Sequence, residues 1–236
     1  TFLKGVPAAG LAAAGAASAR NANTASGVAG GLQPIELPKP ETDGGKSVLA
    51  AIKERRTVRE ISSRKLPPQT LSNLLWAAWG VNRDKGPFGQ LGRTAASASN
   101  SQEIDLYVAM PEGAYLYDAV AHRLIPVVAL DVRAKCGNRG RRPGVDAAVR
   151  LIFVVDIAKY DSAGFDEPGL HDPDIQKSYY NVAIGLIAAN VYLFAASAGL
   201  AAWFHNCDKA GLAEDLKLRP DQRVVYAQTV GYPASA

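Results

Sequence analysis

One short run of the sequence, Glu54-Arg55-Arg56-Thr57-Val58-Arg59-Glu60, is unusually rich in arginine. It follows a segment in which Val48, Ala51 and Ile52 recur at helical spacing after Ser47, so we expect the arginines to lie at the end of a helix. Three guanidinium groups with a hydroxyl between them can bind a phosphate bidentately and reach a second acceptor. The alternative is a solvated charged face, in which the arginines pair with the flanking glutamates.

A second stretch, Arg93-Thr94-Ala95-Ala96-Ser97-Ala98-Ser99-Asn100-Ser101-Gln102, combines very small residues with polar ends. Small side chains let a backbone approach a flat ligand closely, and the hydroxyl and amide groups offer hydrogen bonds. A plain flexible loop would have the same composition, so the stretch is a candidate binding segment only in combination with the basic run.

The rest of the chain mixes helical and strand patterns without strict alternation, which favours an α+β fold. Apolar residues at helical spacing predict helices at 47–56 and 69–80. Alternating or continuous apolar runs predict strands at 104–108, 115–118, 122–126, 151–155, 201–204 and 224–230. Residues 81–93 are polar and glycine-rich, and we expect a loop there.

Residues 179–200 form the most apolar segment, with Gly199 as the expected helix stop. The length is sufficient for a membrane span. We predict no span, because Asn181, Asn190 and Ser197 interrupt the segment and no basic flank marks a cytoplasmic side. A helix that is apolar all round more often lies in a globular core or at a subunit interface.

Composition and motifs exclude several classes of protein. The hydrophobic share of 48% and charged share of 20% are typical of a globular domain, and a net charge of +4 is too small for a nucleic-acid-binding surface. The sequence lacks the common nucleotide-binding, zinc-protease and serine-hydrolase motifs, and its three histidines are scattered, so we expect no metal site. Cys136 and Cys207 could form one disulfide or remain two separate thiols.

The N-terminal residues 1–31 are predicted to be an export leader. An Ala/Gly tract with the mild hydrophobicity of a signal peptide ends in the small-x-small pattern Ala17-Ser18-Ala19. The opening Thr1-Phe2-Leu3-Lys4 is similar to the end of a twin-arginine export signal, so we expect a periplasmic or otherwise exported protein. A disordered leader without an export role is the alternative. Residues 32–45 read as a proline-rich linker, and residues 46–236 as the folded domain.

Together, in this order and spacing, the two stretches resemble the nitroreductase family of flavin enzymes. Residues 55–59 look like that family's Arg-Arg-Ser-x-Arg motif, and residues 94–102 like its Pro-Ser-x-x-Asn-x-Gln segment, with Ala96 where proline is usual. The hairpin at 113–124 is similar to one branch of the family, which oxidises peptide thiazolines and oxazolines. The resemblance covers roughly residues 46–233.

The resemblance implies an α+β homodimer, with a mostly antiparallel central sheet flanked by helices, a long apolar interface helix and FMN at the interface. By position, Arg55 and Thr57 would hold the FMN phosphate, Arg56 the same region, and Arg59 the pyrimidine edge of the flavin. Ser97, Ala98 and Asn100 would reach the flavin from the partner subunit, and the backbone of His205, Asn206 and Cys207 would lie near N5. No side chain is required as a catalytic acid or base.

Two departures from the family pattern affect the expected site. Family members often carry Lys or Arg after the last strand, whereas this sequence ends Tyr232-Pro233-Ala234-Ser235-Ala236, which leaves Arg93 as a candidate substitute in the phosphate site. Many members also have glycine or glutamate near N5, where this chain has His205-Asn206-Cys207.

The predicted function is FMN-dependent transfer of hydride or electrons from a reductant, NAD(P)H being one candidate, to a small organic acceptor such as a nitroaromatic or quinone. Two alternatives stay open. One is a flavin-dependent dehydrogenase of a peptide-derived heterocycle, and the other is a non-catalytic binding protein for an anionic ligand.

Overall fold

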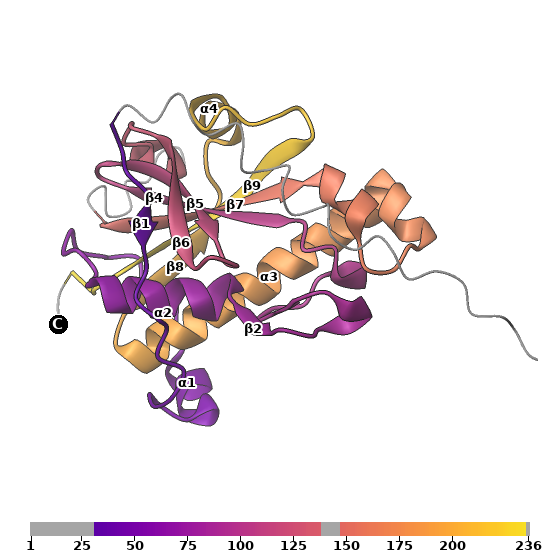
Figure 1. Cartoon of the computed structure of the whole chain (residues 1–236). Helices are drawn as coiled ribbons and strands as arrows, with labels where there is room; N and C mark the ends of the chain where they lie inside the picture. The colour runs from indigo at the N-terminus through magenta and orange to yellow at the C-terminus, as the bar shows by residue number, and fades with distance from the viewer. Residues whose placement is uncertain (1–30, 138–146, 235–236) are drawn as a thin grey trace, which may run out of the picture.

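A seven-stranded sheet forms the centre of the molecule (Figure 1), and every neighbouring pair of its strands is antiparallel. The computed structural model describes residues 31–137 and 147–234, so the predicted leader lies almost entirely outside the described residues. The strand order is β1 (Ile35–Glu36), β6 (Arg123–Val128), β5 (Gly113–Asp118), β4 (Ile104–Met110), β7 (Val149–Asp156), β9 (Gln222–Gly231) and β8 (Ala201–His205). The predicted α+β class and mostly antiparallel sheet are confirmed.

Strand β7 lies inside the sheet, and all of its residues are buried. Its side chains alternate between two apolar layers: Phe153 joins the larger core, whereas Ile152 and Val154 join the smaller one. A strand covered on both faces needs no polar alternation, which is why this strand was predictable from a continuous apolar run.

Helices cover both faces of the sheet (Figure 1). Helices α2 (Pro68–Trp79) and α3 (Pro173–Ala198) pack on one face, while α4 (Lys209–Asp215) packs on the other. Helix α1 (Val48–Glu54) lies against α3, and the side chain of Ser47 caps its N-terminus by accepting a hydrogen bond from the backbone N–H of Ala50. The basic run begins directly after α1, as predicted.

Helix α3 begins earlier than its apolar run, because the side chain of Asp172 caps the first turn and Pro173 occupies the first helical position. It ends as predicted at Gly199, whose φ of 68° is the left-handed conformation that glycine adopts without strain. Among the described residues, α3 alone is long and apolar enough to cross a membrane, which is weak evidence because core helices meet the same criterion. It packs against α2, α1 and the sheet as a core helix does.

Residues 32–45, which we expected to form a linker, pack against the domain. Strand β1 pairs with β6, and the carbonyl of Pro38 accepts a hydrogen bond from the hydroxyl of Ser72 in α2. The neutral His122 ring joins this contact, because its Nε2 lies 3.1 Å from the same carbonyl and its Nδ1 lies 3.0 Å from the Tyr117 hydroxyl. The ordered fold therefore extends well before residue 45.

Two short elements differ from the sequence-based expectation. The predicted loop at 81–93 contains a small hairpin of β2 (Val81–Arg83) and β3 (Gly92–Arg93), whose strands are too short and polar to show alternation. Helix α4 was not predicted, because Leu212 is its only buried residue and leaves almost no apolar stripe to detect.

Candidate functional site

The basic run lies beside β8, the strand at one edge of the sheet. The backbone N–H of Val58 donates to the carbonyl of Ala202 at 3.0 Å, and Ile61 forms a bridge to Pro233. These backbone contacts fix the segment along the strand edge, so the side chains of residues 55–59 have a defined support.

The arginines of the basic run are exposed and unpaired. In the described part of the chain, no carboxylate forms an ion pair with Arg55, Arg56 or Arg59, and Glu54 pairs instead with Lys46. The alternative interpretation, in which the flanking glutamates neutralise the arginines, is therefore wrong. Three guanidinium groups keep their hydrogen-bond donors available to an anion.

Two of these arginines stack on aromatic rings. The Cζ atom of Arg55 lies 5.6 Å from the centre of the Tyr192 ring, and the Cζ atom of Arg59 lies 5.6 Å from the centre of the Trp203 ring. Cation–π contacts of this kind hold a guanidinium plane without consuming its N–H donors. Sequence reasoning missed both aromatic residues, because each lies far along the chain from the arginine that it supports.

A hydroxyl chain connects the run to the edge of β8. Tyr192 accepts a hydrogen bond from the backbone N–H of Phe204 at 2.9 Å, and its oxygen lies 3.1 Å from Oγ1 of Thr57. When the Tyr192 hydroxyl donates to Thr57, the Thr57 proton is available to a ligand.

The last residue of β8, His205, is a neutral histidine. The His205 ring is buried, its Nδ1 donates to the carbonyl of Asn206 at 2.9 Å, and its Nε2 accepts from the Thr229 hydroxyl at 2.8 Å. Burial lowers the pKa of His205, which is consistent with this uncharged tautomer. Asn206 is exposed, and its side-chain oxygen accepts from the N–H of Cys207.

The second predicted segment is a strained and internally bonded loop. Ser99, Asn100 and Gln102 have φ values of 48°, 54° and 52°, which side-chain-bearing residues seldom adopt. The Asn100 amide donates to Gln90 and to the carbonyl of Leu91, so this side chain is held in place within the loop. Concentrated backbone strain of this kind is found most often at binding or catalytic sites.

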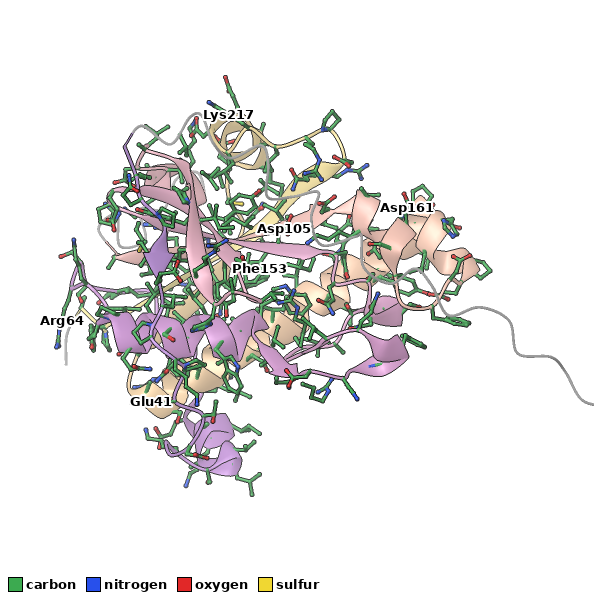
Figure 2. The ribbon with its side chains drawn as sticks, viewed as in Figure 1. Glu41, Arg64, Asp105, Phe153, Asp161 and Lys217 are labelled. Carbon is green, nitrogen blue, oxygen red and sulfur yellow. The ribbon has the colours of Figure 1, made fainter. Side chains whose placement is uncertain are left out.

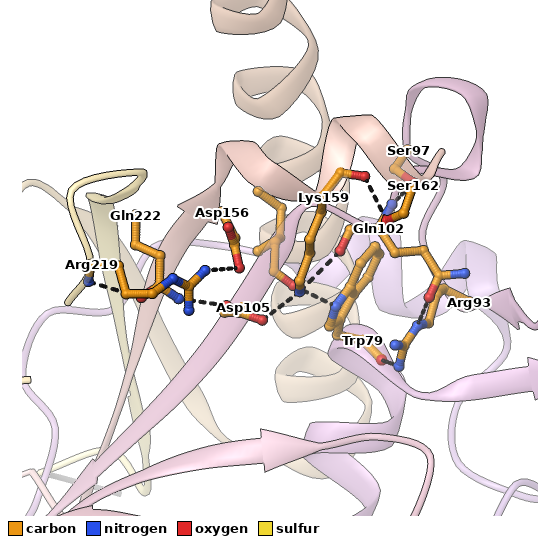
Figure 3. Close-up of polar contacts among 11 residues, drawn as sticks. Trp79, Arg93, Ser97, Gln102, Asp105, Asp156, Lys159, Ser162, Arg219 and Gln222 are labelled. Atoms are coloured by element: carbon orange, nitrogen blue, oxygen red, sulfur yellow. Dashed lines mark hydrogen bonds and ion pairs between the residues drawn. The ribbon is translucent and has the colours of Figure 1, made fainter. Parts of the chain in front are cut away.

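Arg93, the last residue of β3, contacts the strained loop within the same copy (Figure 3). Its guanidinium donates to Oε1 of Gln102 at 2.6 Å and to the carbonyl of Trp79 at 3.3 Å. Burial lowers the pKa of Arg93, and the guanidinium lies over the Trp79 ring. Within one copy the guanidinium is thus bonded to Gln102 and Trp79, and its candidate role in the phosphate site stays a prediction.

One copy of the chain does not bring the two segments together. Figure 2 places Arg64, which follows the basic run, and Asp161 at opposite ends of the molecule. Asp161 lies three residues before Gly164, whose backbone N–H donates to the carbonyl of Ser99 in the second segment. Among the described residues, no hydrogen bond or ion pair joins residues 55–59 to residues 94–102.

Comparisons with known proteins agree on one family. The sequence model described as "Nitroreductase family" matches residues 52–232. A provisionally named nitroreductase of Methanocaldococcus jannaschii is 27% identical over 177 residues, which is 72% of this chain and 82% of that protein.

Solved structures show the same fold. A provisionally named nitroreductase from Ralstonia eutropha is 35% identical, with a TM-score of 0.75 over 89% of this chain and 93% of that one. A nitroreductase of Lactococcus lactis, solved in complex with 4-nitrophenol, is 16% identical with a TM-score of 0.55, covering 80% of this chain and 91% of that one. The chain belongs to the nitroreductase family of oxidoreductases.

Proposed function

We propose that the protein is an FMN-dependent oxidoreductase that passes electrons from a reductant to a small organic acceptor such as a nitroaromatic or quinone. The observation that carries this proposal is the unpaired basic run beside β8, in a chain of the nitroreductase family. FMN, when bound, supplies the redox chemistry itself, while the protein supplies position and charge.

The donors of the basic run fit a phosphomonoester. Arg55, Arg56 and Thr57 are exposed and offer charge and hydrogen-bond donors, and no acidic partner among the described residues competes for them. Arg56 also lines a shallow cavity of about 160 Å³ together with Val58 and Tyr192. We assign the phosphate to this group of residues.

Arg59 and the β8 turn fit the flavin ring. Arg59 lies over Trp203 and would stabilise negative charge at the pyrimidine edge. The backbone of His205, Asn206 and Cys207 would lie near N5, while the His205 ring is bonded to Asn206 and Thr229 and adds no charge of its own.

A second copy of the chain would complete the site. Val48 and Ile52 on α1, and Val182 and Leu186 on α3, are large apolar side chains that are exposed in one copy. Each pair has the i, i+4 spacing of a single helix face, so the two helices together offer a surface suited to a homodimer. Ser97, Ala98 and Asn100 would then contact the flavin from the second copy.

Two exposed aromatic rings form a surface on which the electron acceptor would bind. Phe88 and Phe165 stack with ring centres 5.8 Å apart, although each is more than half exposed. They lie beside the strained loop, because Gly164 donates to the carbonyl of Ser99 at 2.9 Å. A planar acceptor could stack on this pair, and the 4-nitrophenol bound by the Lactococcus lactis relative is a molecule of that class.

The place of action and the electron donor are further parts of the proposal. We place the protein in the periplasm or otherwise outside the cytoplasm, on the basis of the leader at residues 1–31. NAD(P)H is one candidate donor, although a protein exported in folded form would meet little of it.

The test is the cofactor content of the purified protein. We expect a yellow protein that releases FMN, identified by mass spectrometry, and that reduces 4-nitrophenol or a naphthoquinone once a reductant is supplied. A colourless protein that takes up no added FMN, yet binds inorganic phosphate or another anion, would support the non-catalytic binding protein instead. Oxidation of a thiazoline peptide without reduction of nitroaromatics would identify the dehydrogenase alternative.

A further inference from the structure

The two cysteines lie together on the face of the sheet that carries α4. Cys136, the last residue of the short helix η3 (Arg133–Cys136), is fully buried, while Cys207 follows β8 and is partly exposed. Both pack in the smaller apolar core with Val132 and Leu212. The fold therefore brings two thiols that are far apart in the sequence into one cluster.

A backbone hydrogen bond fixes how close the two residues lie. The N–H of Asp208 donates to the carbonyl of Lys135 at 2.9 Å, and this bond joins the residue after Cys207 to the residue before Cys136. Standard backbone dimensions then keep the two Cα atoms within roughly 8 Å of each other. Disulfides span Cα distances of about 4.4–6.8 Å, so little or no movement is required.

Side-chain contacts hold the same two elements together. The ammonium group of Lys135 lies 2.7 Å from the Asp215 carboxylate and 3.3 Å from the carbonyl of Gly211, both in α4. These contacts anchor η3 to the helix that follows the β8 turn, so the cysteines are held near each other in the folded protein.

We propose that Cys136 and Cys207 form a disulfide when the folded protein meets an oxidising thiol–disulfide pool, for which oxidised glutathione is a sufficient oxidant. The more accessible Cys207 thiolate attacks one sulfur of the glutathione disulfide and releases one glutathione. The Cys136 thiolate then attacks the Cys207 sulfur of the mixed disulfide and releases the second. The protein loses two electrons and two protons, and both glutathione molecules leave as thiols.

The cross-link forms slowly unless a catalyst or high pH assists it. Burial raises the pKa of Cys136 to about 12 and that of Cys207 to about 11. Little thiolate is therefore present at neutral pH, and the rate of closure rises with pH over this range. Once formed, the bond closes a loop of about 70 residues that contains β7 and α3, and we expect it to raise the Tm by roughly 10 °C.

The experiment is non-reducing peptide mapping of the full chain. The folded protein is incubated at pH 8.5 with a mixture of reduced and oxidised glutathione, blocked with N-ethylmaleimide and digested without reduction. We expect one cross-linked peptide pair that contains Cys136 and Cys207, lighter by two hydrogens than the two reduced peptides together. The pair is expected to be absent from Cys136→Ala and Cys207→Ala.

Two results would overturn the proposal. One is a protein in which both cysteines carry the blocking group after oxidation. The other is a protein that stops at glutathione attached to Cys207, with Cys136 still reduced, because the second sulfur would then be out of reach. The wild-type digest decides between these outcomes without any variant, so a core substitution that fails to fold does not affect the test.

Discussion

At the residue scale, the strength of the proposed phosphate contact rests on a guanidinium that no carboxylate neutralises. Arg55 is exposed, lies over Tyr192 and keeps its donors available. We expect Arg55→Ala to weaken FMN binding by about 1.5–3 kcal/mol, the usual contribution of a charge-assisted hydrogen bond. This corresponds to a roughly 10- to 150-fold higher Kd, measured by quenching of flavin fluorescence.

Arg64→Ala is the matched control for this measurement. Arg64 is also an exposed arginine stacked on an aromatic ring, 4.0 Å from the centre of Tyr232, but it lies outside the basic run. We expect it to leave the Kd of FMN nearly unchanged. Equal effects of the two substitutions would indicate a general effect of surface charge and would contradict the phosphate assignment.

The buried Glu103 gives a second prediction at this scale, concerning pH. Its Oε2 accepts a hydrogen bond from Ser101 at 2.7 Å, whereas its Oε1 is buried without a hydrogen-bond partner among the described residues. Burial raises the pKa of Glu103, so the folded state holds this proton more tightly than the unfolded state does. The group's contribution to stability is then fully present below its unfolded pKa and is lost as the pH rises through the folded value.

Glu103→Gln removes this titration while keeping the shape of the side chain. We expect the free energy of unfolding of the variant, relative to wild type, to increase from pH 4 toward neutral pH and then to level off. Urea denaturation of both proteins at a series of pH values measures this difference. His205 and His122 titrate in both proteins and cancel in the comparison. Parallel curves across the series would show that Glu103 is not protonated preferentially in the folded state.

At the scale of elements, the sequence predicted best what a single segment determines by itself. Helix α1 with its Ser47 cap, the end of α3 at Gly199 and the apolar strand β7 each depend on local spacing, capping or continuous hydrophobicity. Helix α4 and the β2–β3 hairpin were not predictable in this way. Their residues are short and mostly polar, so their structure depends on where the rest of the chain places them.

In the candidate site, too, the sequence predicted the local segments but not the contacts between distant residues. The basic run and the small-residue loop were recognisable, because their composition is unusual within a few residues. The aromatic residues that contact the basic run were not recognisable, because Tyr192 contacts Thr57 from a position 135 residues later in the sequence. The same holds for residues 32–45, since β1 joins the sheet through backbone groups that any sequence carries.

Gly199 provides a test of how α3 ends. Its φ is 68°, and a Cβ added there would meet no atom within 4 Å, so a substitution changes backbone conformation and little else. We expect Gly199→Ala to lower the free energy of unfolding by roughly 1–2 kcal/mol, the cost of the left-handed conformation for a residue with a Cβ. Chemical denaturation measures the loss.

Gly199→Asn is the control for this substitution, because asparagine tolerates the left-handed conformation better than alanine does. We expect a smaller loss than with alanine, even though the side chain is larger. If the asparagine variant were less stable than the alanine variant, the cost would come from packing and not from the helix end.

At the scale of the whole molecule, the separation of the two predicted segments links cofactor binding to assembly. Among the described residues of one copy, no hydrogen bond or ion pair joins the basic run to the strained loop, and we propose that a flavin contacting both lies between two copies. The exposed apolar faces of α1 and α3 are the surface on which those copies would meet. Loss of the proposed dimer should therefore also reduce the proposed binding of FMN.

Val182→Glu tests this link. Val182 is 63% exposed in one copy, so a charge there costs little in the monomer, whereas burying it unpaired in a dimer costs about 3–5 kcal/mol. We expect dissociation of the dimer to become at least about 100-fold more favourable, measured by sedimentation, with a parallel fall in bound FMN. Val120→Glu is the matched control, because Val120 is 66% exposed but lies in the β5–β6 turn and on neither α1 nor α3. An unchanged dimer in Val182→Glu would place the interface elsewhere, and a monomer with full FMN content would show that one copy of the chain suffices for binding.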